Sequence, residues 1–486
     1  MFNDIRRRSP SNPSSGGATA GRLVRPGSRK GRAFLLTAAA VVASIAVACS
    51  SDNDADTGVS PSPLPAPTAV PASTPEPTAS PAPAPTQAPG DGDRPRIKLR
   101  PTPEGTIAEQ IRNGWLQERV NDGWNTDITK VVPDLKVGLF TKPSDFINKD
   151  GIPSIDSPEF ATASDAPDYM RPEEPVILVN VNGDARAYPL SILMWHEIVN
   201  DEIGGEPVTV TFCPLCNSSV AFSGRHDGRV LDFGTTGWIA SADLVMYDRQ
   251  TETWWQQITG EGVIGEFAGD TLTFLPSSIV GWQDFAEQYP EGKLLLRPVP
   301  GTIHAISGQE ITHNRTYDDP PYSGYDVAGS LPSFFTGAFD LTLQPVDRVA
   351  AFDLGGESVA YPFRALANRP VVNDTVGGEE IVIFFDNGTE SAFRTSTRGQ
   401  NYQTTGSTTA FSRDFEGRTL TFAADDDGII SDAETGTEWN RFGRAIAGEL
   451  AGAQLEAVVH GAEFWFAVAA FNPGIEVRLL ELLASE

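Results

Sequence analysis

The stretch "ARAYPLSILMWHEIVNDEIGGEPVTVTFCPLCNSSV", Ala185 to Val220, decides the fold because the chain contains a second version of it. The second version is "SVAYPFRALANRPVVNDTVGGEEIVIFFDNGTESAF", Ser358 to Phe393, and the two align at one constant offset. After an insertion the match resumes, with "AFSGRHDGRVLDF" (221–233) matched by "AFSRDFEGRTLTF" (410–422). Two copies are too few for a solenoid. The repetition therefore predicts two homologous tandem units that pack with pseudo-two-fold symmetry.

Short strands and short helices are indicated inside each unit. Residues 176–188 alternate between apolar and polar around Asn182-Gly183, a strong signal for a tight β-hairpin. Pro189 then precedes apolar residues at helical spacing, which predicts a helix of one to three turns. The stretches "PVTVTFC", "SVAFSG" and "GRVLDF" are typical of strands. We expect an α+β fold that is rich in strands.

The N-terminal part of the chain has the pattern of an export signal followed by a stalk. Basic residues precede Ala33–Ala48, which has no charge and is too short to cross a bilayer, so residues 1–48 are expected to be a cleaved signal peptide. The sequence Ala46-Val47-Ala48-Cys49 resembles a lipobox, which predicts lipidation of Cys49. Residues 49–95 are dominated by Pro, Ala and Ser and predict a disordered stalk. An uncleaved N-terminal anchor is the alternative.

The rest of the chain divides into four parts. We expect an N-terminal segment packing on the core over 96–169, a first unit over 170–300, a connecting segment over 301–345 and a second unit over 346–486. The net charge of the whole chain is −28, which repels nucleic acid and anionic lipid headgroups. We expect the protein to be exported and anchored in the cell membrane by its N-terminal lipid. It would then face the outside of the cell or the periplasm. No nucleic-acid partner is expected, and the pattern names no protein or small-molecule partner.

Three cysteines occur in the chain, and lipidation of Cys49 leaves only Cys213 and Cys216. A zinc ribbon needs a second pair, which the sequence lacks. A thioredoxin-like thiol pair needs a helix after the motif, whereas "NSSVAFSG" favours turn and strand. The second unit has Asp386 and Thr389 in place of the two cysteines. The fold can therefore form without the pair, which favours a local role for it.

Two interpretations of the pair remain open. In the first, the pair is a metal-binding or redox site, with His196 as a further ligand and Met246 as a weaker one. Two thiolates with an imidazole suit copper or zinc. In the second, Cys213 and Cys216 form a structural disulfide in a non-enzymatic surface binding or assembly module, and His196 only packs its helix. Whether the protein is an enzyme stays undecided.

A polar and aromatic group in "YDRQTETWW" is a second candidate, because Asp248, Arg249, Glu252 and Trp255 could line a cleft. An ion pair at a sheet edge and core tryptophans explain the same residues equally well. A hydrolase that uses this cleft would lack a nucleophile motif. The stretch "AADDDGIISDAE" (423–434) resembles a calcium loop in part, and an acidic turn is the simpler interpretation.

Five stretches of the chain carry a family resemblance: "DGIPSIDSPEF" (150–160), "ARAYPLSILMWHEIVND" (185–201), "VTFCPLCNSSVAF" (210–222), "DLVMYDRQTETWWQQ" (243–257) and "LPSSIVGWQDF" (275–285). Together and in this order they resemble a bacterial and archaeal family known as domain of unknown function 3179. The similarity covers residues 148–300 in detail and, through the repeat, reaches toward the end of the chain. The family has no established activity, so the resemblance implies relatives but no chemistry.

Overall fold

The computed structural model describes residues 107–120, 123–144, 147–393 and 403–479. All of them belong to one unit, Gln87–Glu486. The predicted signal peptide, the stalk and Cys49 lie outside the described residues. None of the helices within the described ranges has the length and hydrophobicity to span a bilayer.

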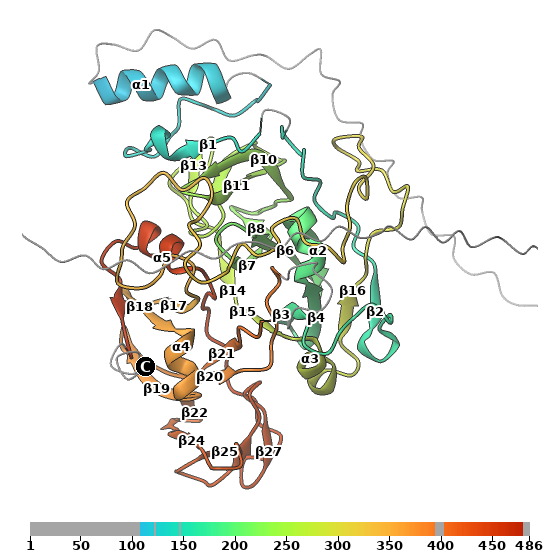
Figure 1. Ribbon diagram of the computed structural model, residues 1–486, viewed down its shortest axis with the longest axis vertical. Helices are drawn as coiled ribbons and strands as arrows, with labels where there is room; N and C mark the ends of the chain where they lie inside the picture. The colour runs from blue at the N-terminus through green and yellow to red at the C-terminus, as the bar shows by residue number, and fades with distance from the viewer. Residues whose placement is uncertain (1–106, 121–122, 145–146, 394–402, 480–486) are drawn as a thin grey trace, which may run out of the picture. The chain divides into compact units, whose positions relative to one another are not determined.

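The fold is α+β and strand-rich, as the sequence predicted (Figure 1). The hairpin predicted around Asn182-Gly183 is present, because both residues adopt the left-handed conformation and Val181 pairs with Asp184. Its strands lie at the centre of a five-stranded sheet in the order β15 (Ser277–Gly281), β3 (Pro175–Val181), β4 (Asp184–Pro189), β16 (Lys293–Leu295) and β2 (Phe160–Thr162).

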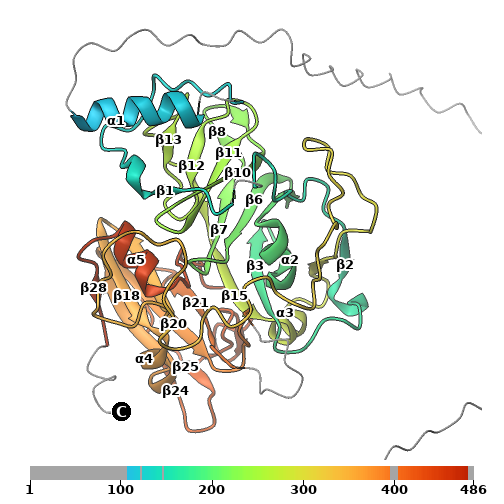
Figure 2. The same ribbon diagram turned by 45° about the horizontal axis from the view of Figure 1, so that its top comes forward.

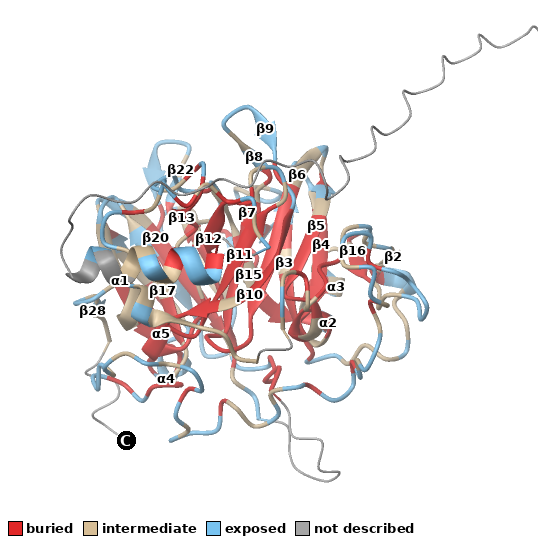
Figure 3. Cartoon of the chain, turned by 90° about the horizontal axis from the view of Figure 1, so that it is seen from above, coloured by how far each residue is buried: buried red, intermediate tan, exposed pale blue. Residues whose placement is uncertain are grey.

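A second sheet carries the cysteine motif at the end of one of its strands. Its order is β14 (Phe274–Leu275), β7 (Ser218–Ser223), β6 (Glu206–Cys213) and β5 (Ile198–Ile203). Helix α2 (Leu190–His196) lies between β4 and β5 in the chain and packs on β6 and β3. Figure 3 shows β3, β6 and β7 largely buried, whereas the β8 (Arg225–His226) and β9 (Arg229–Val230) hairpin is exposed.

The third sheet is built on a long hairpin. It runs in the order β1 (Phe140–Thr141), β10 (Phe233–Ala240), β11 (Asp243–Asp248), β12 (Trp254–Gln256) and β13 (Gly262–Ile264). Helix α1 (Ile107–Trp115) and the π-helical turn Leu116–Val120 lead into this region. Leu116 and Val120 pack with Val245, Tyr247 and Trp254 in one hydrophobic cluster. The N-terminal segment thus covers the face of this sheet that carries those three side chains.

A later part of the chain follows the same order of elements as β3 to β7. It comprises β17 (Val349–Leu354), β18 (Glu357–Pro362), α4 (Phe363–Asn368), β19 (Val371–Val376), β20 (Glu379–Asp386) and β21 (Ser407–Ser412). Side-chain hydrogen bonds recur as well. Tyr188 donates to Asp201 at 2.6 Å, and Tyr361 donates to Asp374 at 2.6 Å. The same local structure is therefore built twice.

The remaining elements are short. They are α3 (Trp282–Gln288), β22 (Asp414–Phe415), β23 (Arg418–Thr419), β24 (Phe422–Ala424), β25 (Ile430–Asp432), β26 (Glu438–Trp439), β27 (Ala445–Ala447), α5 (Trp465–Phe471) and β28 (Glu476–Val477). Between β24 and β25, the carboxylate of Asp425 accepts backbone N–H groups of Asp427 and Ile429, which is an acidic turn. The connecting segment 301–345 has no helix or strand and runs past α2 (Figure 2).

Candidate functional site

The loop that carries the two cysteines is fixed from both sides. Strand β6 ends at Cys213, which pairs with Ser218 at the start of β7. Within the turn, Asn217 has a positive φ of 54°, and its side-chain amide donates to the carbonyl of Ala462 at 2.6 Å. The N–H of Phe464 donates to the carbonyl of Cys216 at 2.9 Å. The loop is thereby held against residues that directly precede α5.

The two thiols converge on a carboxylate that the sequence pattern did not single out. The Sγ atoms of Cys213 and Cys216 and one carboxylate oxygen of Asp243 all lie within 4.8 Å of one another. The Cys216 thiol donates to Oδ1 of Asp243 at 2.9 Å, and the Cys213 thiol lies 3.7 Å from the carbonyl of Ala242. The three residues are 2%, 0% and 0% exposed, and neither cysteine is in a disulfide. We call these three residues the thiol–carboxylate cluster.

Local structure explains how Asp243 reaches the cysteines. It begins β11 directly after Ser241 and Ala242, which both have positive φ (51° and 65°) and turn the chain sharply. Its Oδ2 accepts hydrogen bonds from the Ile258 N–H at 3.0 Å and the Gln256 side chain at 2.5 Å. The carboxylate is therefore oriented by two donors, and Oδ1 faces the thiols. Donors behind a carboxylate ligand are typical of metal sites.

Two further buried carboxyl groups surround the cluster. Burial raises the pKa of Glu197 and of Glu463 to about 8, and the nearby Asp243 adds to both shifts. Oε2 of Glu463 has no hydrogen-bond partner within the described structure. Gly461 makes room for this side chain, because a Cβ at Gly461 would lie 1.8 Å from Oε1 of Glu463. Glu197 follows α2 at a positive φ of 59°, a strained conformation of the kind found at functional sites.

The buried acidic groups in this region are not balanced by paired basic side chains of the described residues. Burial raises the pKa of Asp243 to about 6 and raises the pKa of both thiols. Within the described residues no Lys or Arg forms an ion pair with Cys213, Cys216, Asp243, Glu197 or Glu463. Near neutral pH both thiols and the carboxyl groups of Glu197 and Glu463 are therefore protonated, whereas Asp243 is mostly ionised. A bound cation would replace those protons and balance the charge.

The structure corrects the expectation that His196 is a third ligand. Its Nδ1 donates to the Pro153 carbonyl at 2.9 Å, and its Nε2 accepts from the Tyr317 hydroxyl at 2.9 Å. Burial lowers the pKa of His196 to about 3. Both ring nitrogens are therefore occupied away from the thiols, and Asp243 stands where an imidazole was expected. Met246 is buried in the hydrophobic cluster that contains both cysteines, and its role as a ligand stays a prediction.

Two members of the predicted cleft are part of a turn instead. Asp248 accepts hydrogen bonds from the Thr251 N–H at 2.6 Å and from the Trp255 indole at 2.9 Å. Asp248 and Trp255 are fully buried. Asp432 makes the same two contacts in the later segment, at 2.6 Å with the Thr435 N–H and at 2.9 Å with the Trp439 indole. The arrangement is structural in both places, because it recurs where the cysteines are absent.

Glu252 fixes the N-terminal segment to this turn. Its carboxylate accepts from the N–H of Asn125 at 2.5 Å and pairs with Lys149 at 2.7 Å. It adopts a φ of 56°, and Gly436 takes the equivalent place in the later turn with a φ of 66°. A glutamate is thus kept in a conformation that favours glycine. The contacts to Asn125 and Lys149 offset the conformational strain of a glutamate at this positive φ.

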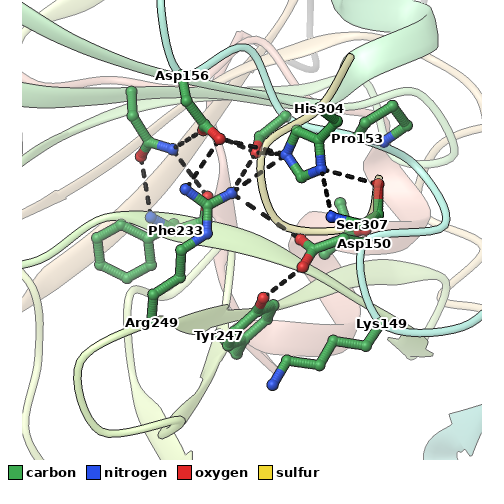
Figure 4. A network of polar contacts seen from close by, with 12 residues as sticks. Lys149, Asp150, Pro153, Asp156, Phe233, Tyr247, Arg249, His304 and Ser307 are labelled. Carbon is green, nitrogen blue, oxygen red and sulfur yellow. Dashed lines mark hydrogen bonds and ion pairs between the residues drawn. The ribbon is translucent and has the colours of Figure 1, made fainter. Parts of the chain in front are cut away.

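Arg249 belongs to a polar network between distant parts of the chain (Figure 4). It pairs with Asp156 at 3.0 Å and donates to the Ser154 hydroxyl at 2.7 Å. His304 of the connecting segment lies 3.2 Å from the Asp156 carboxylate. Burial of Asp156 acts to raise its pKa, but the hydrogen bond from His304 and the charge of Arg249 outweigh it and lower the pKa to about 2. The corresponding residue of the later turn is Ala433, so this network belongs to one segment only.

The network contains a serine, a histidine and an aspartate, yet it is not a catalytic triad. Ser154 and Asp156 both approach Nε2 of His304, at 3.4 and 3.2 Å. Nδ1 of His304 accepts from the N–H of Ser307 at 3.1 Å. A triad needs the acid and the serine at opposite ring nitrogens. The network therefore joins the connecting segment to the turn that follows β11.

Sequence reasoning missed Asp243, Glu197 and Glu463. A signal for Asp243 exists, since the hairpin 233–248 is longer than its counterpart 422–432, and the additional residues carry the aspartate. Glu197 adjoins the histidine that was chosen. Glu463 gives no signal, because only the fold brings it near the cysteines.

Comparison with known proteins gives a family but no activity. The family model described as "Protein of unknown function (DUF3179)" matches residues 149–475. The chain therefore belongs to this family, which confirms the resemblance found in its sequence. No curated protein and no solved structure matches the chain.

Proposed function

We propose that the thiol–carboxylate cluster is a metal centre and that zinc is the ion it holds. The observation that carries the proposal is the convergence of Cys213, Cys216 and Asp243 in a fully buried place, without a disulfide and without an ion pair to any Lys or Arg of the described residues. Thiolate and carboxylate oxygen are both ligands of zinc. A bound ion would also compensate the charge of the buried carboxyl groups nearby.

A metal centre fits the electrostatics better than thiol redox catalysis. A reactive thiol needs a lowered pKa, usually from a neighbouring cation or a helix N-terminus. Here burial raises the pKa of both thiols, and the nearby carboxyl groups add to it. In the metal-free protein both thiols are therefore protonated and unreactive near neutral pH. A metal ion would deprotonate them.

Zinc is preferred to copper because of the carboxylate. Copper(I) favours soft sulfur and imidazole ligands, whereas zinc accepts sulfur, nitrogen and oxygen together. Three protein ligands leave one tetrahedral position open, which is typical of catalytic rather than structural zinc. Glu197 and Glu463, which burial protonates in the metal-free protein, would release and take up protons near that position. We propose Lewis-acid chemistry on a small substrate as the activity.

The proposal extends to the organisation of the chain. The two segments with equivalent elements would be duplicated units with pseudo-two-fold symmetry, of which only the first keeps the metal centre. The repeated order of strands and the matching tyrosine–aspartate hydrogen bonds support this. In the second segment Asp386 and Thr389 replace the cysteines, and the shorter hairpin has no counterpart of Asp243.

We further propose that the protein is exported and held at the membrane by a lipid on Cys49. The support is the order of a basic region, a short apolar run and the lipobox-like residues, followed by the stalk. The metal centre would then operate outside the cytoplasm, where metal binding protects thiols from oxidation.

Elemental analysis of the full-length protein, purified from its own compartment, tests the proposal. We expect about one zinc per chain, retained in Cys49→Ser and in Asp386→Asn, which alters the second-segment residue at the place of Cys213. Replacing both Cys213 and Cys216 by serine should abolish the metal, and Asp243→Asn should lower its content strongly. A metal-free protein with a Cys213–Cys216 disulfide, or zinc that persists in the double serine variant, would contradict the proposal.

A further inference from the structure

A pocket of about 560 Å³ lies beside the C-terminal end of α2. Met194 and Trp195 of the helix form part of its wall, and Gly151 and Ile152 form another part. The connecting segment forms the rest of the wall with residues that include Arg315 and Tyr322. Its volume is in the range of sites for small organic molecules, roughly 300–1,000 Å³.

One wall residue of this pocket also contacts the hydrophobic core around the cysteines. Tyr322 lines the pocket and packs against the hydrophobic cluster that contains Cys213 and Cys216. Burial raises the pKa of Tyr322, and the charges of Glu197 and Cys213 add to the shift. Glu197 also follows Trp195 by two residues at the end of α2. The pocket therefore adjoins the hydrophobic cluster in which both cysteines lie.

The pocket contains a guanidinium group that has no carboxylate partner among the described residues. Nε of Arg315 donates to the carbonyl of Trp195 at 3.2 Å, and one terminal nitrogen donates to the carbonyl of His313 at 3.0 Å. No carboxylate of the described residues forms an ion pair with it, and burial lowers its pKa. A partly buried guanidinium held by carbonyls keeps donors for an anion, which it binds in a fixed planar geometry.

The other charged groups of the wall are consistent with a single anion-binding position. Glu310 is the carboxylate of the wall, and its Oε1 accepts from the Gly301 N–H at 2.9 Å and the Thr312 hydroxyl at 3.0 Å. His313 is exposed, and its charge is among the causes that lower the pKa of Glu310, after the two hydrogen bonds. One guanidinium with apolar and aromatic neighbours suits a monoanion with an apolar body, rather than a phosphate that requires several cations.

We propose that this pocket binds a small organic carboxylate, with its charge on Arg315 and its apolar body against Trp195 and Tyr322. This proposal rests on the proposed function in one respect, because the carboxylate would be the substrate or product handled at the metal centre. Binding itself depends on the pocket and does not require the metal.

Calorimetric titration of the full-length protein with benzoate tests the proposal, with benzyl alcohol as the uncharged counterpart. We expect benzoate to bind more tightly than the alcohol, by about 10-fold or more, because a hydrogen bond to a charged group contributes roughly this much. Arg315→Gln should remove the preference for benzoate and leave binding of the alcohol unchanged, and Arg315→Lys should restore part of it. Arg229→Gln, which alters an exposed arginine paired with Glu266, is the matched control.

The titration is repeated on zinc-loaded protein and on the double serine variant of Cys213 and Cys216. Binding of benzoate that depends on Arg315 in both preparations supports the pocket, even if no zinc is found and the metal centre fails. Equal binding of benzoate and benzyl alcohol, or a preference that survives Arg315→Gln, overturns it. A loss of both ligands in Arg315→Gln overturns it as well, because Arg315 would then only hold the wall in place.

Discussion

Replacing Glu463 by glutamine should stabilise the metal-free protein at neutral pH. The Glu463 carboxyl is buried, and its pKa is raised from 4.5 to about 8. At pH 7 the folded state therefore keeps a proton that the unfolded state loses. Each pH unit above the unfolded pKa lowers stability by about 1.4 kcal/mol, so the span from 4.5 to 7 amounts to about 3 kcal/mol. Glutamine has nearly the same shape and cannot ionise.

The sign of this effect gives a clear pH profile. Stability associated with Glu463 is complete below pH 4.5 and is lost as the pH rises toward 8. We expect Glu463→Gln and the wild type to unfold at similar urea concentrations at pH 4.5. At pH 7 the variant should be more stable by about 3 kcal/mol in chelator-treated protein. Glu438→Gln, which alters an exposed glutamate of the same segment, should show no such difference.

Zinc should reduce the advantage of the variant. A cation in the thiol–carboxylate cluster favours the charged form of a neighbouring carboxyl group, so Glu463 would ionise at a lower pH. The gain at pH 7 should therefore be smaller in loaded protein than in chelator-treated protein. A Glu463→Gln variant that is less stable than the wild type at pH 7 without metal would refute the reasoning.

Three other outcomes are expected. Asp156→Asn should cost about 2 kcal/mol at pH 7 in urea unfolding, because the pKa of Asp156 is lowered from 3.8 to about 2. That contribution is present above pH 3.8 and is lost toward pH 2, so wild type and variant should converge in acid. Asp248→Asn and Asp432→Asn should each lower stability by about 1–3 kcal/mol without changing zinc content, since both carboxylates only close a turn. Mass spectrometry of the mature protein should find lipid on Cys49 as the first residue, and an intact N-terminus would contradict this.

Strand content and local turns were predictable because they depend on neighbours in the sequence. The alternation around Asn182-Gly183 and the proline before α2 determine their elements with little help from distant residues. The recurrence of Tyr188 and Asp201 as Tyr361 and Asp374 was also visible, and these residues form the same hydrogen bond in each segment.

The composition of the site was only partly predictable, because its members come from distant segments. Cys213 and Cys216 share one turn and were evident, whereas Asp243 reaches them only after β10 and β11 have paired. His196 was a reasonable choice by residue type, yet its ring is held by the Pro153 carbonyl and Tyr317. Sequence spacing indicates which residue types can serve as ligands, and tertiary packing decides which of them meet.

Zinc K-edge X-ray absorption on the full-length protein tests the central claim most directly. We expect two sulfur neighbours at about 2.3 Å and oxygen neighbours at about 2.0–2.2 Å, with the sulfur signal absent from the double serine variant of Cys213 and Cys216. Asp243→Asn should change the oxygen shell and keep both sulfurs. A protein without zinc, or a zinc ion without sulfur neighbours, would contradict the assignment of the thiol–carboxylate cluster as a metal centre.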